Sequence, residues 1–268
     1  MSETGIGLWG VPLAILGGAI RVSTPFLFVS LGECLTERSG RINLGLEGTL
    51  VFGAMAGYAI AYETGNPWAG VLAAAIAGAA FGLVHGLLCK LPKVNDIAIG
   101  IALMLLGMGL AFFFGKPYIQ PVAPDLPAIE LGAWSSYPQV QAALRVNVLF
   151  VIGAGMAVAL WWVFRATKVG LIVRVVGDST DAARAMGLRP NRIRIASTAV
   201  GGASAGVAGA LLFGGAGALG PALQSVGVTS GYYLFYAAPY VLTLGMLIAT
   251  SSTTRAMSGA PGELSITK

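Results

Sequence analysis

Residues able to do acid–base or metal chemistry are few in this 268-residue chain. Its single histidine, His85, stands between glycines near the end of an apolar run, and we assign no second metal ligand near it. A packed histidine is therefore favoured over a metal ligand, and we expect no metal and no cofactor. One histidine supports no serine–histidine–aspartate or cysteine–histidine set, and the acids are too scattered for a catalytic carboxylate pair. Catalysis by this chain alone is not expected.

Nucleotide-binding patterns are equally weak. Residues 215–220 match G-x-G-x-x-G, but the preceding strand, the following helix start and the downstream acid of a dinucleotide site are missing. The chain contains no G-x-x-x-x-G-K-[ST] sequence, so it has no P-loop with which to hydrolyse ATP. Any energy from ATP must therefore come from a partner.

Polar residues interrupt the apolar sequence at 32–48, namely Glu33, Glu37, Arg38, Arg41, Asn43 and Glu47. A charge at membrane depth costs about 2.5 to 3.5 kcal/mol, so such residues must pair, reach the interface or line a wet cavity. A cytoplasmic hairpin explains the arginines, whereas for Glu47 a position facing a polar cavity is an equally good explanation. Asn95 and Asp96 are expected to cap the next helix, the alternative being a role at the inner end of a substrate path. The candidates for a ligand path are Asn43, Glu47 and Asn95.

A long basic segment, 165–194, carries seven cations against Asp178 and Asp181, and elsewhere positive and negative charges balance. Because lysine and arginine concentrate in short cytoplasmic loops, this segment predicts the orientation of the chain rather than affinity for nucleic acid. Its centre, 181–187, reads as a short helix stopped by Gly187, a shape suited to docking a cytoplasmic partner.

The composition of the chain indicates a membrane protein. Hydrophobic residues make up 56% of the chain, charged residues 10%, and the mean hydropathy is +0.80, whereas soluble domains carry about 25% charged residues. A spanning helix needs about 20 apolar residues. We predict an all-α, polytopic transmembrane helical bundle of about eight segments: 6–20, 22–36, 44–62, 68–89, 94–115, 147–164, 195–213 and 232–250. The glycine-rich stretch 214–231 is expected to be a re-entrant or surface loop.

Glycines, cysteines and charges add three expectations. Gly78, Gly82 and Gly86 recur every four residues, as do Gly53 with Gly57 and Gly202 with Gly206, a spacing that favours close helix packing. The cysteines, Cys34 and Cys89, are expected to be packed thiols rather than a disulfide. With eight crossings the charges near 38–41 and 90–93 share a side with 165–194, both termini are cytoplasmic, and the proline-rich connection 116–146 is an extended external loop.

Two motifs carry a family resemblance. The run from Gly32-Glu33 through Glu37-Arg38-Ser39-Gly40 and 42–48 resembles the signature of inner-membrane permeases of ABC importers for nucleosides and simple sugars. Residues 175–178 and 181–187, and then 206–211, are similar to the same family in consistent order. The resemblance implies that residues 177–187 form the coupling helix that seats in a groove of the ATPase, with Gly177, Asp181, Ala182, Ala183, Arg184 and Gly187 as coupling residues.

The resemblance further implies the partners and location of the chain. These are a cytoplasmic ATPase subunit, a second homologous permease or another copy of this chain, and an external substrate-binding protein or lipoprotein. The chain is expected to be one transmembrane permease domain, 1–268, in the plasma membrane of a bacterium or archaeon. It would carry no catalytic residues of its own.

The chain departs from that family in two places. Relatives carry another pair of membrane segments after the position of Leu212, and their asparagine near the middle of the 94–115 helix is replaced around Met104. These departures leave two alternatives to an ATP-driven importer. One is a secondary transporter or channel that works without ATP, and the other is a truncated scaffold subunit that does not conduct.

Overall fold

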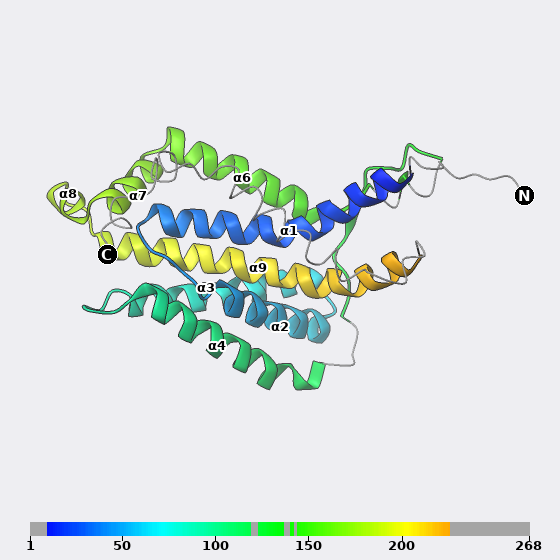
Figure 1. Ribbon diagram of the computed structural model, residues 1–268, viewed down its shortest axis with the longest axis horizontal. Coiled ribbons are helices and arrows are strands. Elements are labelled where there is room, and N and C mark those ends of the chain that lie inside the picture. Colours follow the sequence, from blue (N-terminus) through cyan, green and yellow to red (C-terminus); the bar gives the residue numbers. More distant parts are fainter. Residues whose placement is uncertain (1–9, 119–122, 137–139, 142–143, 226–268) are drawn as a thin grey trace, which may run out of the picture.

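The computed structural model describes residues 10–118, 123–136, 140–141 and 144–225. The first helix, α1 (Gly10–Arg38), is 29 residues long and continuous. The prediction of two segments, 6–20 and 22–36, is therefore wrong: Arg21 and Pro25 lie inside one helix, which changes direction toward its N-terminal end (Figure 1). Proline removes one hydrogen bond of a helix, yet membrane helices tolerate it, and here the helix continues through Pro25.

Three helices follow, near their predicted positions: α2 (Leu46–Thr64), α3 (Pro67–Leu88) and α4 (Asp96–Gly115), which continues into the 3-10 turn η2 (Lys116–Tyr118). The turn between α2 and α3 is specified locally. Gly65 has φ +65°, the side chain of Asn66 accepts from the backbone N–H of Trp68, and Pro67 occupies the first turn. Each apolar run is thus bounded by residues that end or begin a helix.

The described residues of the proline-rich connection, 116–118, 123–136, 140–141 and 144–146, lie at the end of the bundle opposite α8 (Figure 1). Two short strands, β1 (Ala128–Glu130) and β2 (Arg145–Asn147), pair antiparallel within it, with Ile129 opposite Val146. This small sheet was not predicted, because three-residue strands leave no periodic signal in a sequence. Asn147 then caps α6 (Val148–Ala166) by accepting from the N–H of Leu149.

The basic segment folds as helices rather than as an open loop: α7 (Lys168–Asp178), α8 (Thr180–Ala185) and the start of α9 (Pro190–Ser225). Helix α9 runs unbroken for 36 residues, so the expected loop is wrong for 214–225, while 226–231 and the predicted segment 232–250 lie outside the described residues. Alanines and leucines between the glycines of 214–225 favour helix, and membrane helices tolerate glycine and an occasional proline.

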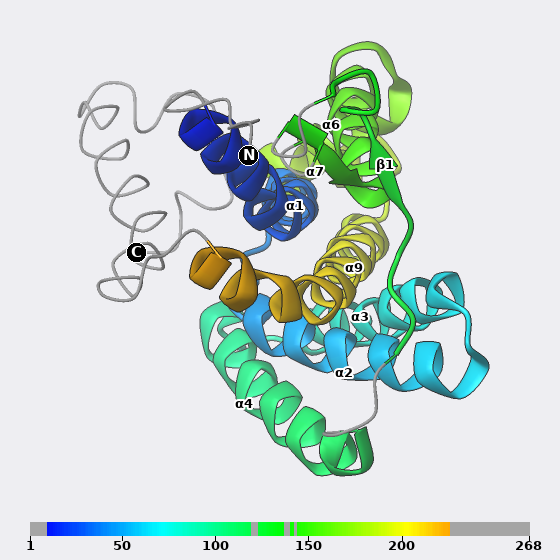
Figure 2. The same ribbon diagram turned by 90° about the vertical axis from the view of Figure 1, so that its right-hand side faces the viewer.

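Helix α9 lies at the centre of the bundle, with α1 on one side and α2 and α3 on the other (Figures 1 and 2). Helix α4 packs outside α2, and α6 packs outside α1. Within the described residues, three helices are long and apolar enough to cross a membrane, Pro67–Leu88, Asp96–Tyr118 and Val148–Ala166. The molecule is mostly helical, as predicted. The predicted count of about eight membrane segments is not confirmed by the described residues.

Glycines line the contact between α3 and α9. A Cβ placed on Gly78, Gly82 or Gly206 would collide with the backbone of the facing helix, at Gly202, Thr198 and Ala74 respectively. Gly53 of α2 meets Gly206 in the same way. The prediction that these glycines form helix contacts is confirmed, and α2, α3 and α9 form a block with backbones in direct contact.

Large apolar side chains on the outer helices face away from this block. Helix α4 exposes Phe112 and Phe113, and α6 exposes Trp161 and Trp162. Exposed aromatic faces on helices of spanning length are typical of contact with lipid.

The two cysteines differ in burial, and both are free thiols. Cys34 is exposed, so the expectation of a packed thiol is wrong there, whereas Cys89 is buried, as expected.

Candidate functional site

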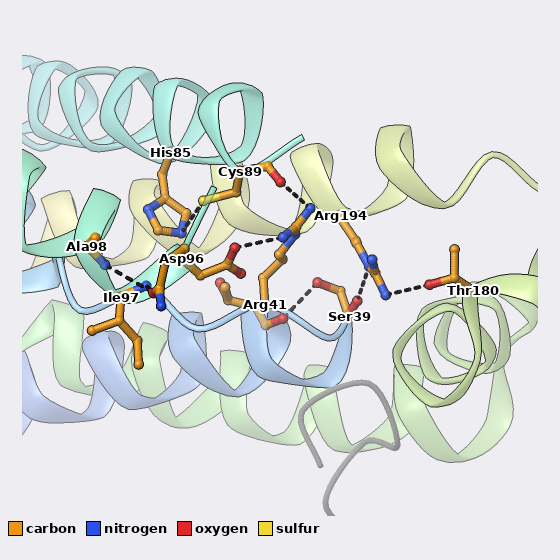
Figure 3. A network of polar contacts seen from close by, with 11 residues as sticks. Ser39, Arg41, His85, Cys89, Asp96, Ile97, Ala98, Thr180 and Arg194 are labelled. Atoms are coloured by element: carbon orange, nitrogen blue, oxygen red, sulfur yellow. Dashed lines mark hydrogen bonds and ion pairs between the residues drawn. The ribbon is translucent and has the colours of Figure 1, made fainter. Parts of the chain in front are cut away.

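Three segments that are far apart in the sequence meet at one end of the bundle: residues 36–45, residues 89–96 and residues 176–194. We call this region the polar end. Helices α7 and α8 project from it (Figure 1), and polar contacts tie its segments to one another (Figure 3). The charges near 38–41, 90–93 and 165–194 therefore lie at the same end, as the sequence predicted.

Helix α8 is a short helix closed at both ends. Ser179 Oγ accepts from the N–H of Ala182 at 3.2 Å, and Gly187, with φ +76°, ends the helix while the N–H of Leu188 donates to the carbonyl of Ala183 at 3.0 Å. Left-handed backbone favours glycine, and this bond closes the C-terminal turn. The predicted helix stopped by a glycine is confirmed.

The predicted coupling residues divide into two groups. Asp181, Ala182 and Arg184 are exposed, and the Asp181–Arg184 ion pair of 3.2 Å is open to solvent, with side chains 92% and 63% exposed. Ala183 is fully buried, and Gly177 is also buried, where a Cβ would collide with the carbonyl of Arg38. The first group is available to a partner, and the second packs the segment onto the bundle.

Met186 extends the exposed face of α8, with 62% of its surface accessible. It directly follows α8 and precedes Gly187, and its exposure makes the side chain available to a partner. A flexible thioether is well suited to filling an irregular groove on a partner. The sequence showed this methionine within the motif, but the motif did not distinguish it from packed neighbours.

Arg194 connects α8 to the rest of the bundle (Figure 3). Its guanidinium donates to the carbonyl of Ser39 at 3.0 Å, to the carbonyl of Val176 at 3.1 Å and to Thr180 Oγ1 at 3.1 Å, and the residue is only 8% exposed. The fork of donors on arginine matches several acceptors at once. Sequence reasoning counted Arg194 with the other cations of the 165–194 segment, because composition does not reveal which cation is buried.

Arg41 makes the corresponding contact on the other side of the polar end. It donates to Asp96 Oδ1 at 2.7 Å and to the carbonyl of Cys89 at 2.6 Å. Both charged side chains are largely buried. The pair fastens the loop after α1 to the end of α3 and the start of α4, a contact that the sequence did not predict.

The candidates for a ligand path have local partners. Asn43 is buried, its Oδ1 accepts from the N–H of Gly45 at 2.9 Å, and its own N–H donates to Glu33 Oε1 at 3.0 Å. Asn95 caps α4 by accepting from two backbone N–H groups, as expected, and Glu47 is exposed in the first turn of α2. No hydrogen bond or ion pair joins the three side chains within the described part of the chain. Their role in a ligand path stays a prediction.

His85 is fully buried, as expected, but it is not isolated. Its Nε2 lies 3.5 Å from Cys89 Sγ, and a carboxylate oxygen of Asp96 lies within 4.8 Å of both. Sequence reasoning assigned no second ligand near this histidine, and the structure corrects that reading. The signal was present in the spacing, since His85 and Cys89 are one helical turn apart.

Comparison with known proteins matches residues 15–250 to the family described as "Branched-chain amino acid transport system / permease component". The putative glucose ABC transporter permease protein TsgC13 of Haloferax volcanii is 33% identical over 203 residues, covering 74% of this chain and 62% of that protein. The nucleoside ABC transporter permease protein NupC of Lactococcus lactis is 27% identical, covering 74% and 66%. The guanosine ABC transporter permease protein NupQ of Bacillus subtilis is 25% identical, covering 73% and 65%.

The chain thus spans a little under two thirds of the length of these relatives. No solved structure matches it. The relatives confirm the family that the two sequence motifs indicated.

Proposed function

Because the chain belongs to the family described as the permease component of the branched-chain amino acid transport system, we propose that it is the membrane-spanning subunit of an ATP-driven ABC importer. Relatives are named for glucose, nucleoside and guanosine transport, which supports a nucleoside or simple sugar as the ligand. The partners are a cytoplasmic ATPase, a second permease or another copy of this chain, and an external binding protein or lipoprotein. The chain itself hydrolyses no ATP.

The projection of α8 from the polar end carries this proposal. An ATPase must grip a part of the permease that is exposed to it yet fixed to the spanning helices. Helix α8 has both properties, because Asp181, Arg184 and Met186 are exposed while Ala183 is buried against the bundle. The length of α8 suits a short projecting helix that binds in a groove of the ATPase.

Arg194 provides the contact through which a displacement of α8 would reach the spanning helices. A displacement of α8 acts on Thr180, whose hydroxyl meets the Arg194 guanidinium, and the same guanidinium holds the carbonyl that follows α1, at Ser39. Arg194 belongs to α9, which packs on α1, α2 and α3. One buried side chain therefore connects the docking helix to the centre of the bundle.

In this assignment the polar end faces the cytoplasm and the 116–146 connection faces outward, within one permease domain in a bacterial or archaeal plasma membrane. Because α1 is one continuous helix rather than two, a single crossing by it would place its start toward the outside, instead of the cytoplasmic side expected from the sequence for the N-terminus. ATP binding would draw two coupling helices together and switch the pathway between outward and inward access. Such a switch requires that the partners bind the two states with different affinity.

A crosslinking experiment tests the proposal. Cysteine is introduced as Met186→Cys in a Cys34→Ser background, and living cells are treated with a short membrane-permeant bifunctional reagent before mass spectrometry. We expect one crosslinked partner that carries P-loop nucleotide sites. Trp134→Cys, which is exposed in the 116–146 connection, is the control and is expected to crosslink to no ATPase.

Labelling of the same two variants with an impermeant maleimide tests orientation. In intact cells Trp134→Cys is expected to react and Met186→Cys to be protected until the membrane is opened. Reaction of Met186→Cys from outside would exclude the docking role. Uptake by the purified chain alone in liposomes would instead favour a secondary transporter or channel, and ATPase binding without uptake by the full complex would favour a scaffold subunit.

The ligand class is tested separately on the assembled complex. Nucleosides and simple sugars are screened for an increase in unfolding temperature, since a ligand that binds the folded state stabilises it. Asn43→Ala, Glu47→Gln and Asn95→Ala are then compared. A residue of the ligand path is expected to lose the ligand-induced increase, whereas a residue with a local role changes the unfolding temperature with and without ligand alike.

A further inference from the structure

Three side chains with metal-binding atoms converge where α3 ends and α4 begins (Figure 3). His85 lies in the last turn of α3, Cys89 follows that helix, and Asp96 is the first residue of α4. One donor atom from each lies within 4.8 Å of the other two. The function proposed above uses neither His85 nor Cys89.

The separation of the donors fits a tetrahedral ion. Zinc binds histidine nitrogen at about 2.0 to 2.1 Å and cysteine sulfur at about 2.3 Å, which places the two ligand atoms about 3.5 Å apart in a tetrahedron. His85 Nε2 and Cys89 Sγ are separated by 3.5 Å. Nitrogen, sulfur and carboxylate oxygen together are a donor set that zinc accepts, whereas magnesium and calcium favour oxygen alone.

The backbone brings these donors together for local reasons. His85 and Cys89 are four residues apart, so they share one face of the helix end. The chain then turns sharply, with the N–H of Leu91 bonded to the carbonyl of Leu88 and Lys93 at φ +65°. Asn95 caps α4 and fixes Asp96 in its first turn. The third donor thus returns to the first two after six residues.

Charge and outer contacts suit a divalent cation. On binding, the Cys89 thiol loses its proton to solvent, so that thiolate and carboxylate together balance the charge of the ion. Arg41 opposes the ion by its charge, but it donates to Oδ1 of Asp96 and thereby orients the carboxylate, whose other oxygen it leaves free. Such an outer-shell contact commonly orients ligating carboxylates.

We propose that His85, Cys89 and Asp96 bind one Zn²⁺ ion, with a water molecule as the fourth ligand. The ion links the end of α3 to the start of α4 and stabilises the turn between them. This site would be separate from the coupling helix and does not depend on the transport function.

Cobalt substitution tests the site in the purified full-length protein in detergent, after treatment with a chelator. Co²⁺ bound to a thiolate in a tetrahedral site gives visible d–d bands and a near-ultraviolet charge-transfer band. We expect these bands to saturate at one Co²⁺ per chain and to disappear when one equivalent of Zn²⁺ is added. Absence of the bands from the wild-type protein would overturn the proposal, whatever the variants do.

The two cysteines of the chain provide a matched pair of variants. Cys89→Ser is expected to lose the charge-transfer band, and Cys34→Ser, at the exposed cysteine, to keep it. The reverse pattern would place the cobalt elsewhere and overturn the site. If Cys89→Ser does not fold, Zn²⁺-dependent increases in unfolding temperature are compared in Cys89→Ala and Cys34→Ser, and an equal increase in both would also overturn it.

Discussion

The glycine-lined block of α2, α3 and α9 and the polar end are held together in opposite ways. In the block, backbone meets backbone, and Gly78 and Gly206 leave no room for a side chain. At the polar end, separate segments are joined by charged side chains that reach across, chiefly Arg194 and Arg41. Dispersion contacts over a wide area resist any sliding, whereas a few directed hydrogen bonds fix position at particular points.

This difference indicates where movement enters the molecule. A close-packed block transmits displacement as a unit, because its helices have no alternative arrangement at the same spacing. A joint built from long side chains tolerates small rotations while its hydrogen bonds persist. In the proposed function, the polar end would receive the movement of the ATPase, and the block of α2, α3 and α9 would move with it.

The largest expected effect comes from adding bulk to the block. Gly206→Val would drive a side chain into the backbone of α3 at Ala74, and overpacking of this kind costs about 3 kcal/mol or more when backbone must move. We expect little folded protein in the membrane fraction. Gly155→Val on α6 is the control, because nothing lies within 4 Å of the added Cβ there. Equal recovery of both variants after size-exclusion chromatography would contradict the tight contact.

Removal of the Arg194 guanidinium is expected to have the next largest effect. Arg194→Met leaves buried acceptors at Ser39 and Val176 without this donor, a loss of about 1 to 3 kcal/mol per group left unsatisfied. We expect a lower unfolding temperature in detergent and weaker protection of α8 from proteolysis. The neighbouring exposed Arg192→Met should behave as the wild type. If the two variants unfold at the same temperature, Arg194 does not hold α8.

A comparison of two ion pairs gives the smallest effect. In chelator-treated protein, a double-mutant cycle of Arg41→Met and Asp96→Asn is expected to give a coupling energy of about 1 to 2 kcal/mol, because both groups are largely buried. The same cycle with Asp181→Asn and Arg184→Met should give no measurable coupling, since that pair is open to solvent. Similar coupling in both cycles would show that burial does not set the strength of the first pair.

Sequence patterns predicted those features that depend on neighbouring residues. Apolar runs of spanning length located α3, α4 and α6, the four-residue spacing of Gly78 and Gly82 located the contact with α9, and Gly187 marked the end of α8. In each instance the physical cause acts within a few residues along the chain or on one helix face. The motif 175–187 also indicated the family, which the family match over residues 15–250 shows.

Features that depend on distant partners were missed. Arg194 differs from Arg192 only in what faces it after folding, and its acceptor at Ser39 is 155 residues away in the sequence. Arg41 finds Asp96 in the same way, across 55 residues. The continuity of α1 through Pro25 and of α9 through 214–225 was also missed, because glycine and proline read as helix breakers in a sequence, although membrane helices tolerate both.

Helix α9 has a mechanical consequence that follows from its length. Its 36 residues span about 54 Å at 1.5 Å per residue, so each degree of tilt at the polar end shifts the far end by about 1 Å. The helix begins three residues after Gly187, so in the proposed function a movement of α8 would be enlarged along α9. Because α2 and α3 pack tightly against α9, a tilt of a few degrees would move the three helices together.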